Sequence, residues 1–329
     1  MGLHPPTFAV RARSAPAALA LAFVAAAGCA SKPAIDPRYR PSESVLEILA
    51  VLQHHVPDDT YRFAPARDFT GRNVYRSSLL RLENLERLHA DALRAGQLDG
   101  VIAFGKARAL ERLGAYGLAS EAYELAAERD PSLTEEALDS ADLCDGLERA
   151  REIQTELVSA TQDSALLEIP SPVSALERYE QRAALLEALS IEAEDTHYAS
   201  IVREETERND LERALYFVRV RNLLVDGDVR AVAELERVVT LHAESKLSAR
   251  HMLDLADLYA SLSTEYVDRY APESLDFDPA EFRDLVDSSA RLYEMVASRD
   301  GTTEKIEATR RLEAFLAFAL GVDRDRFTP

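Results

Sequence analysis

Apolar residues recur every three or four positions along most of the chain, which is the period of an α-helix with one buried face. Leu82, Leu85 and Leu88 follow this spacing and predict a long helix that ends at Gly96. The same period predicts further helices at residues 44–52, 101–113, 117–129, 133–144, 147–160, 173–194, 197–208, 211–225, 229–243, 248–268, 280–298 and 303–320. No segment alternates apolar and polar positions as a half-buried strand does, and only 12 of 329 residues are glycine. The pattern predicts an all-α protein.

Local signals mark where several of these helices begin. A serine followed three residues later by a glutamate forms a capping-box pattern, and it predicts helix starts at Ser44, Ser132 and Ser174. Asp278 before Pro279 predicts another start, because proline is well tolerated in the first helical turn. Residues 53–73 show no clear period.

The stretch GVIAFGKARALERLGAYGLASEAYELAAERDPS, residues 100–132, carries the most specific internal pattern. Ala107 and Ala119 are small where two antiparallel helices would approach closely, and Leu110 and Tyr123 would fill the space beside them. The spacing resembles a tetratricopeptide repeat at the positions Ala107, Leu110, Ala119, Tyr123, Ala126 and Pro131. Ala103 and Lys106 depart from the large apolar residues of that family. Because one such hairpin cannot bury its apolar face alone, the resemblance implies helix hairpins stacked as an α-solenoid.

The N-terminus has the features of an export signal. Arg11 and Arg13 precede an apolar run over residues 15–27, which is shorter than the roughly 20 residues that a membrane-spanning helix needs. The run ends in Ala26-Ala27-Gly28-Cys29, which resembles the lipobox of bacterial lipoproteins. The resemblance implies that Cys29 is acylated and becomes the mature N-terminus, and Ala30 after it implies sorting to the outer membrane. An ordinary secretory signal with a chance cysteine is the alternative.

The mature chain would be strongly acidic. The whole chain has 38 basic and 58 acidic side chains, a net charge of −20, and the loss of two arginines with the signal would make it −22. This charge disfavours a nucleic-acid partner. The only other cysteine, Cys144, lies with Ala137 and Ala141 on the apolar face of a helix, which predicts a buried thiol rather than a reactive one.

Residues 59–81 reverse this charge, with five arginines against two aspartates. Arginine and aromatic residues are enriched in interface cores, and long irregular loops in compact domains tend to be functional. The segment therefore supplies a candidate partner surface made of Arg62, Phe63, Arg67, Phe69, Arg72 and Tyr75. Alternatively, it lies on the protein's own acidic helices, for which residues 187–210 offer eight carboxylates against two arginines. An unpaired basic strip beside an acidic body favours this self-contact.

Candidate chemistry is scarce. The sequence contains no glycine-rich phosphate loop, no GxSxG, no HExxH and no CxxC motif. His54, His55, Asp58 and Asp59 are the nearest approach to a metal cluster, but adjacent histidines point in different directions on a helix. Asp195 with His197 suggests only a solvated helix start. The sequence predicts no catalytic residue, no metal ligand and no cofactor.

These observations predict a chain in five parts: a signal peptide over residues 1–28, a lipidated tether over 29–43, N-terminal helices with the arginine-rich loop over 44–98, tetratricopeptide-like repeats over 99–167 and a degenerate helical-repeat region over 168–329. The expected function is a non-catalytic scaffold, lipid-anchored on the periplasmic face of the outer membrane, that binds a protein or peptide of the cell envelope through its helical-repeat surface. A metal-dependent envelope hydrolase using the His54 to Asp59 cluster is the alternative.

Overall fold

The computed structural model describes residues 39–153 and 172–326. The chain divides into two compact units, Met1–Pro41 and Ser42–Pro329, and apart from Pro41 the described helices belong to the second unit. The predicted signal peptide and Cys29 lie outside the described residues, as does part of the helix predicted at 147–160. No described helix is both long enough and apolar enough to cross a membrane.

Within its described residues the protein is all-α, as predicted. An isolated bridge between Arg67 and Asn73 is the nearest approach to a sheet in this part of the chain. A short 3-10 helix, η1 (Arg221–Leu223), follows the helix Tyr198–Val220. The α-helices are α2 (Pro41–Asp58), α3 (Val74–Ala95), α4 (Asp99–Arg112), α5 (Tyr116–Arg129), α6 (Thr134–Glu152), α7 (Pro172–Glu192), α8 (Tyr198–Val220), α9 (Gly227–Leu241), α10 (Ser248–Arg269), α11 (Pro279–Ala297) and α12 (Glu304–Asp325).

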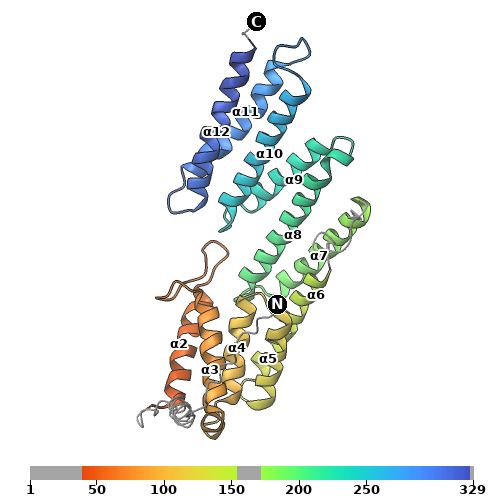
Figure 1. Ribbon diagram of the computed structural model, residues 1–329. Coiled ribbons are helices and arrows are strands. Elements are labelled where there is room, and N and C mark those ends of the chain that lie inside the picture. Colours follow the sequence, from red (N-terminus) through yellow and green to blue (C-terminus); the bar gives the residue numbers. More distant parts are fainter. Residues whose placement is uncertain (1–38, 154–171, 327–329) are drawn as a thin grey trace, which may run out of the picture. The chain divides into compact units, whose positions relative to one another are not determined.

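From α3 onward each helix packs against the next one in the chain, so the fold is a series of neighbouring helix pairs (Figure 1). This arrangement is consistent with an α-solenoid. The helix α2 contributes Val45, Ile48 and Leu52 to a core shared with α3 and α4. Gly105 of α4 lets α2 approach closely, because a Cβ atom there would lie 2.5 Å from Cδ2 of Leu49.

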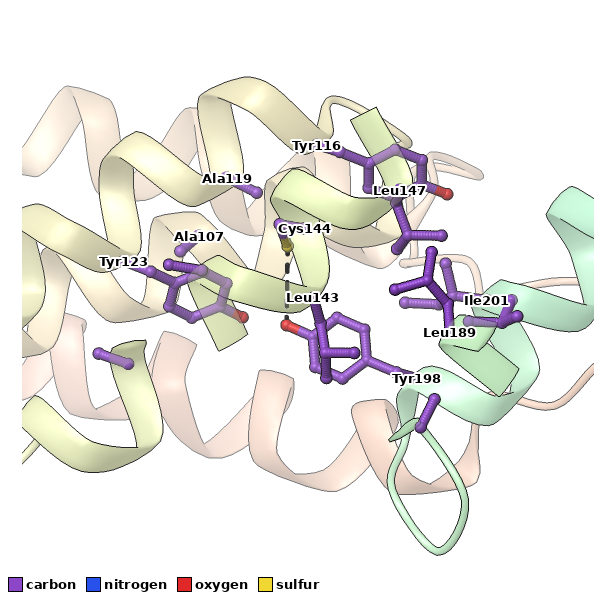
Figure 2. Close-up of a cluster of buried hydrophobic side chains, with 14 of the residues drawn as sticks. Ala107, Tyr116, Ala119, Tyr123, Leu143, Cys144, Leu147, Leu189, Tyr198 and Ile201 are labelled. Carbon is purple, nitrogen blue, oxygen red and sulfur yellow. Dashed lines mark hydrogen bonds between the residues drawn. The ribbon is translucent and has the colours of Figure 1, made fainter. Parts of the chain in front are cut away.

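The core between α4 and α8 contains most of the positions that matched the tetratricopeptide pattern (Figure 2). Ala107, Ala119, Tyr123 and Ala126 are fully buried. Leu110 is half-buried, and Pro131 is exposed in the turn between α5 and α6. Cys144, with Ala137 and Ala141, is buried in the same core, which confirms the prediction of a buried thiol. Burial raises the pKa of this thiol, so it stays protonated and unreactive.

Two predicted helix breaks are wrong. Gly146 does not end a helix, because α6 continues through it and Leu189 of α7 packs where a side chain would stand. The break expected near Asn209 is also absent, since α8 runs from Tyr198 to Val220. Asn209 donates to the carbonyl of Tyr179 at 3.2 Å, so its polar group is bonded to α7 and does not compete with the helix backbone.

The capping predictions have mixed outcomes. Asp278 accepts from the backbone N–H of Ala280 and Gly96 caps α3, both as predicted. The capping box at Ser132 is wrong, because this side chain donates to Asp130 and the helix begins at Thr134. The start at Ser44 is also wrong, since α2 begins at Pro41, and α7 begins two residues before Ser174.

Candidate functional site

The loop between α2 and α3, residues 59–73, is anchored at its base to the turn between α9 and α10. Tyr61 and His242 are joined by a hydrogen bond of 2.6 Å between the hydroxyl and Nδ1. The backbone N–H of Lys246 donates to the carbonyl of Tyr61 at 3.1 Å, and Arg62 forms an ion pair with Glu244. Tyr61 and Arg62 therefore do contact the protein itself, but the partners His242, Glu244 and Lys246 lie outside the acidic residues 187–210 that were expected.

The imidazole of His242 links this anchor to α8. Its Nε2 lies 2.9 Å from Oδ2 of Asp210, which can only accept a hydrogen bond, so Nε2 carries a proton and donates it to Asp210. Burial and the nearby Glu207 raise the pKa of Tyr61, so its hydroxyl remains a donor. Arg237 also pairs with Asp210, at 2.9 Å.

Asp68 holds the middle of the loop in one shape. Its carboxylate accepts from the backbone and hydroxyl of Thr70, from the backbone of Arg72 and from the hydroxyl of Ser77. These hydrogen bonds, of which those from Ser77 and Thr70 contribute most, lower the pKa of Asp68. Gly71 has a φ of +79°, which allows the tight turn that brings these donors together.

The tip of this loop presents its apolar and basic side chains to solvent. Phe69 is 101% exposed and Phe63 is 70% exposed. Arg67 makes one long hydrogen bond, 3.5 Å, to the carbonyl of Gly71, and within the described chain neither Arg67 nor Arg72 pairs with a carboxylate. The self-contact interpretation is therefore wrong for these two arginines.

The six residues of the candidate partner surface thus divide into two groups. Arg62 fixes the base of the loop, and Tyr75 is buried in α3 with its hydroxyl donating to the carbonyl of His55. The other four, Phe63, Arg67, Phe69 and Arg72, form the surface that we call the loop tip.

The histidine cluster on α2 does not converge. His54 and Asp58 are both largely exposed, and their nearest atoms are 3.8 Å apart. Asp59 instead forms a buried ion pair with Arg112, at 3.6 Å. Within the residues that the structure describes, no three His, Cys, Asp or Glu side chains are placed to hold a metal ion. The geometry gives no support to a metal site here.

A buried polar network that the sequence did not predict lies between α4, α5 and α8. Glu111 of α4 is completely buried and accepts hydrogen bonds from the hydroxyls of Tyr123 and Tyr198, which converge in Figure 2. His197 Nε2 lies 2.7 Å from Oε1 of Glu111, and Arg108 Nη1 lies 3.5 Å from the same oxygen. His197 does precede the first turn of α8, so the helix start is confirmed, but its side chain is paired with Glu111 and is not solvated as expected.

The charge of Glu111 survives its burial because donors surround it. Desolvation alone would raise the pKa of Glu111, but the hydrogen bond from His197 and the charge of Arg108 outweigh it and lower the pKa. A buried tyrosine hydroxyl needs a hydrogen-bond partner. The burial expected for Tyr123 in the helix hairpin could therefore have indicated a polar group nearby. A second network joins Glu207 to His251 and Ser245 between α8 and α10.

A groove of about 860 Å³ lies beside this first network, between α2 and α4. Apolar side chains form most of its walls, and polar groups of Arg108, Glu136 and His197 line it where α4 approaches α6 and α8.

Comparisons with known proteins find no matching family model, no similar curated protein and no similar solved structure.

Proposed function

We propose that this protein is a non-catalytic scaffold of the cell envelope that binds a protein or peptide partner through the loop tip. The observation that carries the proposal is the full exposure of Phe69 on the same loop as the exposed side chains of Phe63, Arg67 and Arg72, a loop that is anchored at its base. Large aromatic side chains exposed together are typical of interaction sites, and arginine and aromatic residues are enriched in the cores of interfaces.

The anchoring of the loop supports this role. Binding costs less conformational entropy when the contact residues are already held in place. The hydrogen bonds to Asp68 fix the backbone from Asp68 to Arg72, which carries Phe69, and the hydrogen bond of Tyr61 fixes the base of the loop.

The chemistry of the loop tip indicates the complementary surface. Two phenylalanine rings fit apolar pockets, and two arginines that meet no carboxylate among the described residues fit acidic groups around those pockets. A partner with carboxylates around an apolar depression fits this surface. Electrostatic attraction of this kind raises the association rate and weakens as salt increases.

The helical body serves as the support in this proposal, as a tetratricopeptide-like α-solenoid. Ala107 of α4 and Ala119 of α5 are fully buried where the two helices meet, which supports a close-packed hairpin of this type.

The proposed location rests on the sequence around Cys29. Acylation there would tether the protein to the periplasmic face of the outer membrane, because several acyl chains hold a protein stably where one holds it only marginally. The proline-rich residues after Cys29 would act as an extended tether.

Site-specific photo-crosslinking in intact cells tests the proposal. A photoreactive residue at Phe69 should trap an envelope protein, whereas the same residue at Leu88, which is exposed on α3, should not. Substitution of Arg67 and Arg72 by alanine in the Phe69 crosslinking variant should reduce the adduct. Equal adducts at both positions would contradict the proposal.

A further inference from the structure

The groove between α2 and α4 is long, and most of the side chains that line it are apolar. Its α2 wall runs along one helical face from Leu46 to Pro57, which rises about 16 Å. Val101 and Phe104 of α4 form the opposite wall, and Leu133 closes the side toward α6. A volume of about 860 Å³ lies within the range of about 300–1,000 Å³ that is usual for ligand pockets.

Arg108 is the one cation of α4 that lines the groove, and the protein holds its guanidinium in a fixed orientation. The side chain is only 13% exposed, and Nη1 lies against the buried carboxylate of Glu111. The ring of Phe104 lies 4.9 Å from the guanidinium carbon and the ring of Tyr123 lies 5.5 Å from it. Although burial opposes it, the charge of Glu111 raises the pKa of Arg108, so the cation is permanent.

The other edge of this guanidinium has a replaceable partner. Arg108 Nη2 donates to Oε1 of Glu136 at 2.8 Å, and the side chain of Glu136 is 63% exposed on α6. The carboxylate of Glu136 is largely hydrated, so it can rotate into water, and Arg108 then keeps the buried carboxylate of Glu111 as its counter-charge. Arg108 can therefore exchange Glu136 for the carboxylate of a ligand.

We infer that this groove binds an amphipathic carboxylate with a long aliphatic chain. The carboxylate replaces Glu136 on Nη2 of Arg108, and the chain lies along the apolar walls formed by Leu46, Leu49 and Phe104. The site uses none of the residues of the loop tip, so it is independent of the proposed partner-binding function.

An aliphatic chain suits these walls better than an extended peptide does. A peptide backbone carries a donor and an acceptor at nearly every residue, and each needs a partner when it is buried. The walls between Val101 and Phe104 and along Leu46, Leu49 and Ala50 are apolar, with Gln53 as the polar side chain on the α2 wall, and the charged side chains of the groove, Arg108 and Glu136, meet at one place. One anionic head group with an apolar body matches that distribution of charge.

Titration calorimetry with dodecanoate tests the inference on the full chain bearing Cys29→Ala, so that no attached lipid competes. Saturable binding with one ligand per chain is expected. Dodecanol, which has the same chain without the charge, should bind about tenfold or more weakly, because hydrogen bonds to a charged group are the stronger ones. Decanoate, with two methylenes fewer, should bind on the order of tenfold more weakly than dodecanoate.

Two pairs of variants locate the site. Glu136→Gln should bind dodecanoate about twofold to fivefold more tightly, since it removes the competing ion pair, whereas Glu135→Gln should not change the affinity. Ala50→Trp should fill the groove and abolish binding, while Ala92→Trp, at an exposed position of α3 outside the groove, should leave it intact. Circular dichroism would confirm that each variant is folded.

Three results would overturn the inference: no saturable binding of dodecanoate, equal affinity for dodecanoate and dodecanol, or equal binding by Ala50→Trp and Ala92→Trp. If dodecanoate fails to bind and a photoreactive residue at Ala50 traps a protein, the groove is a docking site for a partner helix and the assignment to an aliphatic carboxylate is wrong.

Discussion

Tyr61 in the α2–α3 loop and His242 at the end of α9 are 181 residues apart in sequence, and their side chains meet in a hydrogen bond of 2.6 Å. The bond fixes the base of the loop whose tip carries Phe63 and Phe69. It also completes a chain of polar groups, because His242 in turn donates to Asp210. The shape of the loop tip therefore depends on helices far along the chain.

Tyr61→Phe should destabilise the protein by about 1 kcal/mol, because it removes this hydrogen bond and leaves Nδ1 of His242 without the hydroxyl of Tyr61. The loop should also become more sensitive to proteases. Urea unfolding of the variant measures the first effect and limited proteolysis the second. Tyr270→Phe serves as the control. This substitution keeps the ring that contacts Tyr266, so little change in stability is expected. Equal midpoints for the two variants would show that the hydrogen bond does not stabilise the loop.

Ala119→Arg should destabilise the helix pair α4–α5 by several kcal/mol, on the order of the overpacking and charge-burial costs in protein cores. Ala119 is fully buried, so the new side chain has neither space nor solvent. Glu121→Arg introduces the same side chain two residues away at an exposed position and should change stability little. Thermal unfolding separates them, and equal melting temperatures would contradict the close-packed hairpin.

The buried carboxylate of Glu111 predicts a dependence of stability on acid pH. Its pKa in the folded protein is lowered below the ordinary value of 4.5, so the stabilisation that it provides is present above that value and is lost as the pH falls through the folded-state pKa. Glu111→Gln should cost about 3–5 kcal/mol at neutral pH, because it removes the buried charge that accepts from Tyr123, Tyr198 and His197 and leaves Arg108 with the exposed Glu136 alone. The difference in unfolding free energy between wild type and variant should therefore shrink below pH 4.5. A constant difference from pH 7 to pH 3 would contradict this role.

Cys29→Ala should prevent lipidation if the N-terminus is processed as the lipobox resemblance implies. The variant should remain uncleaved, become soluble in the periplasm or be degraded, since the acyl chains would be the only stable attachment that we propose. Metabolic labelling with a fatty acid decides the matter. Incorporation that persists in the variant would rule out Cys29 as the acylated residue.

The helices could be predicted from sequence because burial of one face imposes a period that is visible locally. Leu82 and Leu85 are buried as that period requires, whereas Leu88, which follows the same spacing, is 57% exposed just before the kink at His89. The errors arose where tertiary contacts override local signals. Gly146 resembles a helix end but serves a close approach to Leu189, and Ser132 resembles a cap but bonds to Asp130.

The polar networks could not be predicted in the same way. Glu111 and His197 are 86 residues apart, so nothing in the sequence near either residue indicates the other. The arginine-rich loop was recognised from its composition, but composition does not distinguish Arg62, which meets Glu244, from Arg67 and Arg72, which meet no carboxylate within the described chain. Long-range geometry alone separates the anchoring residues from the exposed ones.

The most direct test of partner binding is the double variant Phe63→Ser with Phe69→Ser. Both side chains are largely exposed and lie outside the core clusters, so the urea unfolding curve should not change by more than about 0.5 kcal/mol. Binding of the partner trapped at position 69, measured by titration of the purified proteins, should fall at least about tenfold, as expected for the loss of aromatic anchors from an interface. A variant that keeps both its stability and its affinity would contradict the claim that the loop tip is the binding surface.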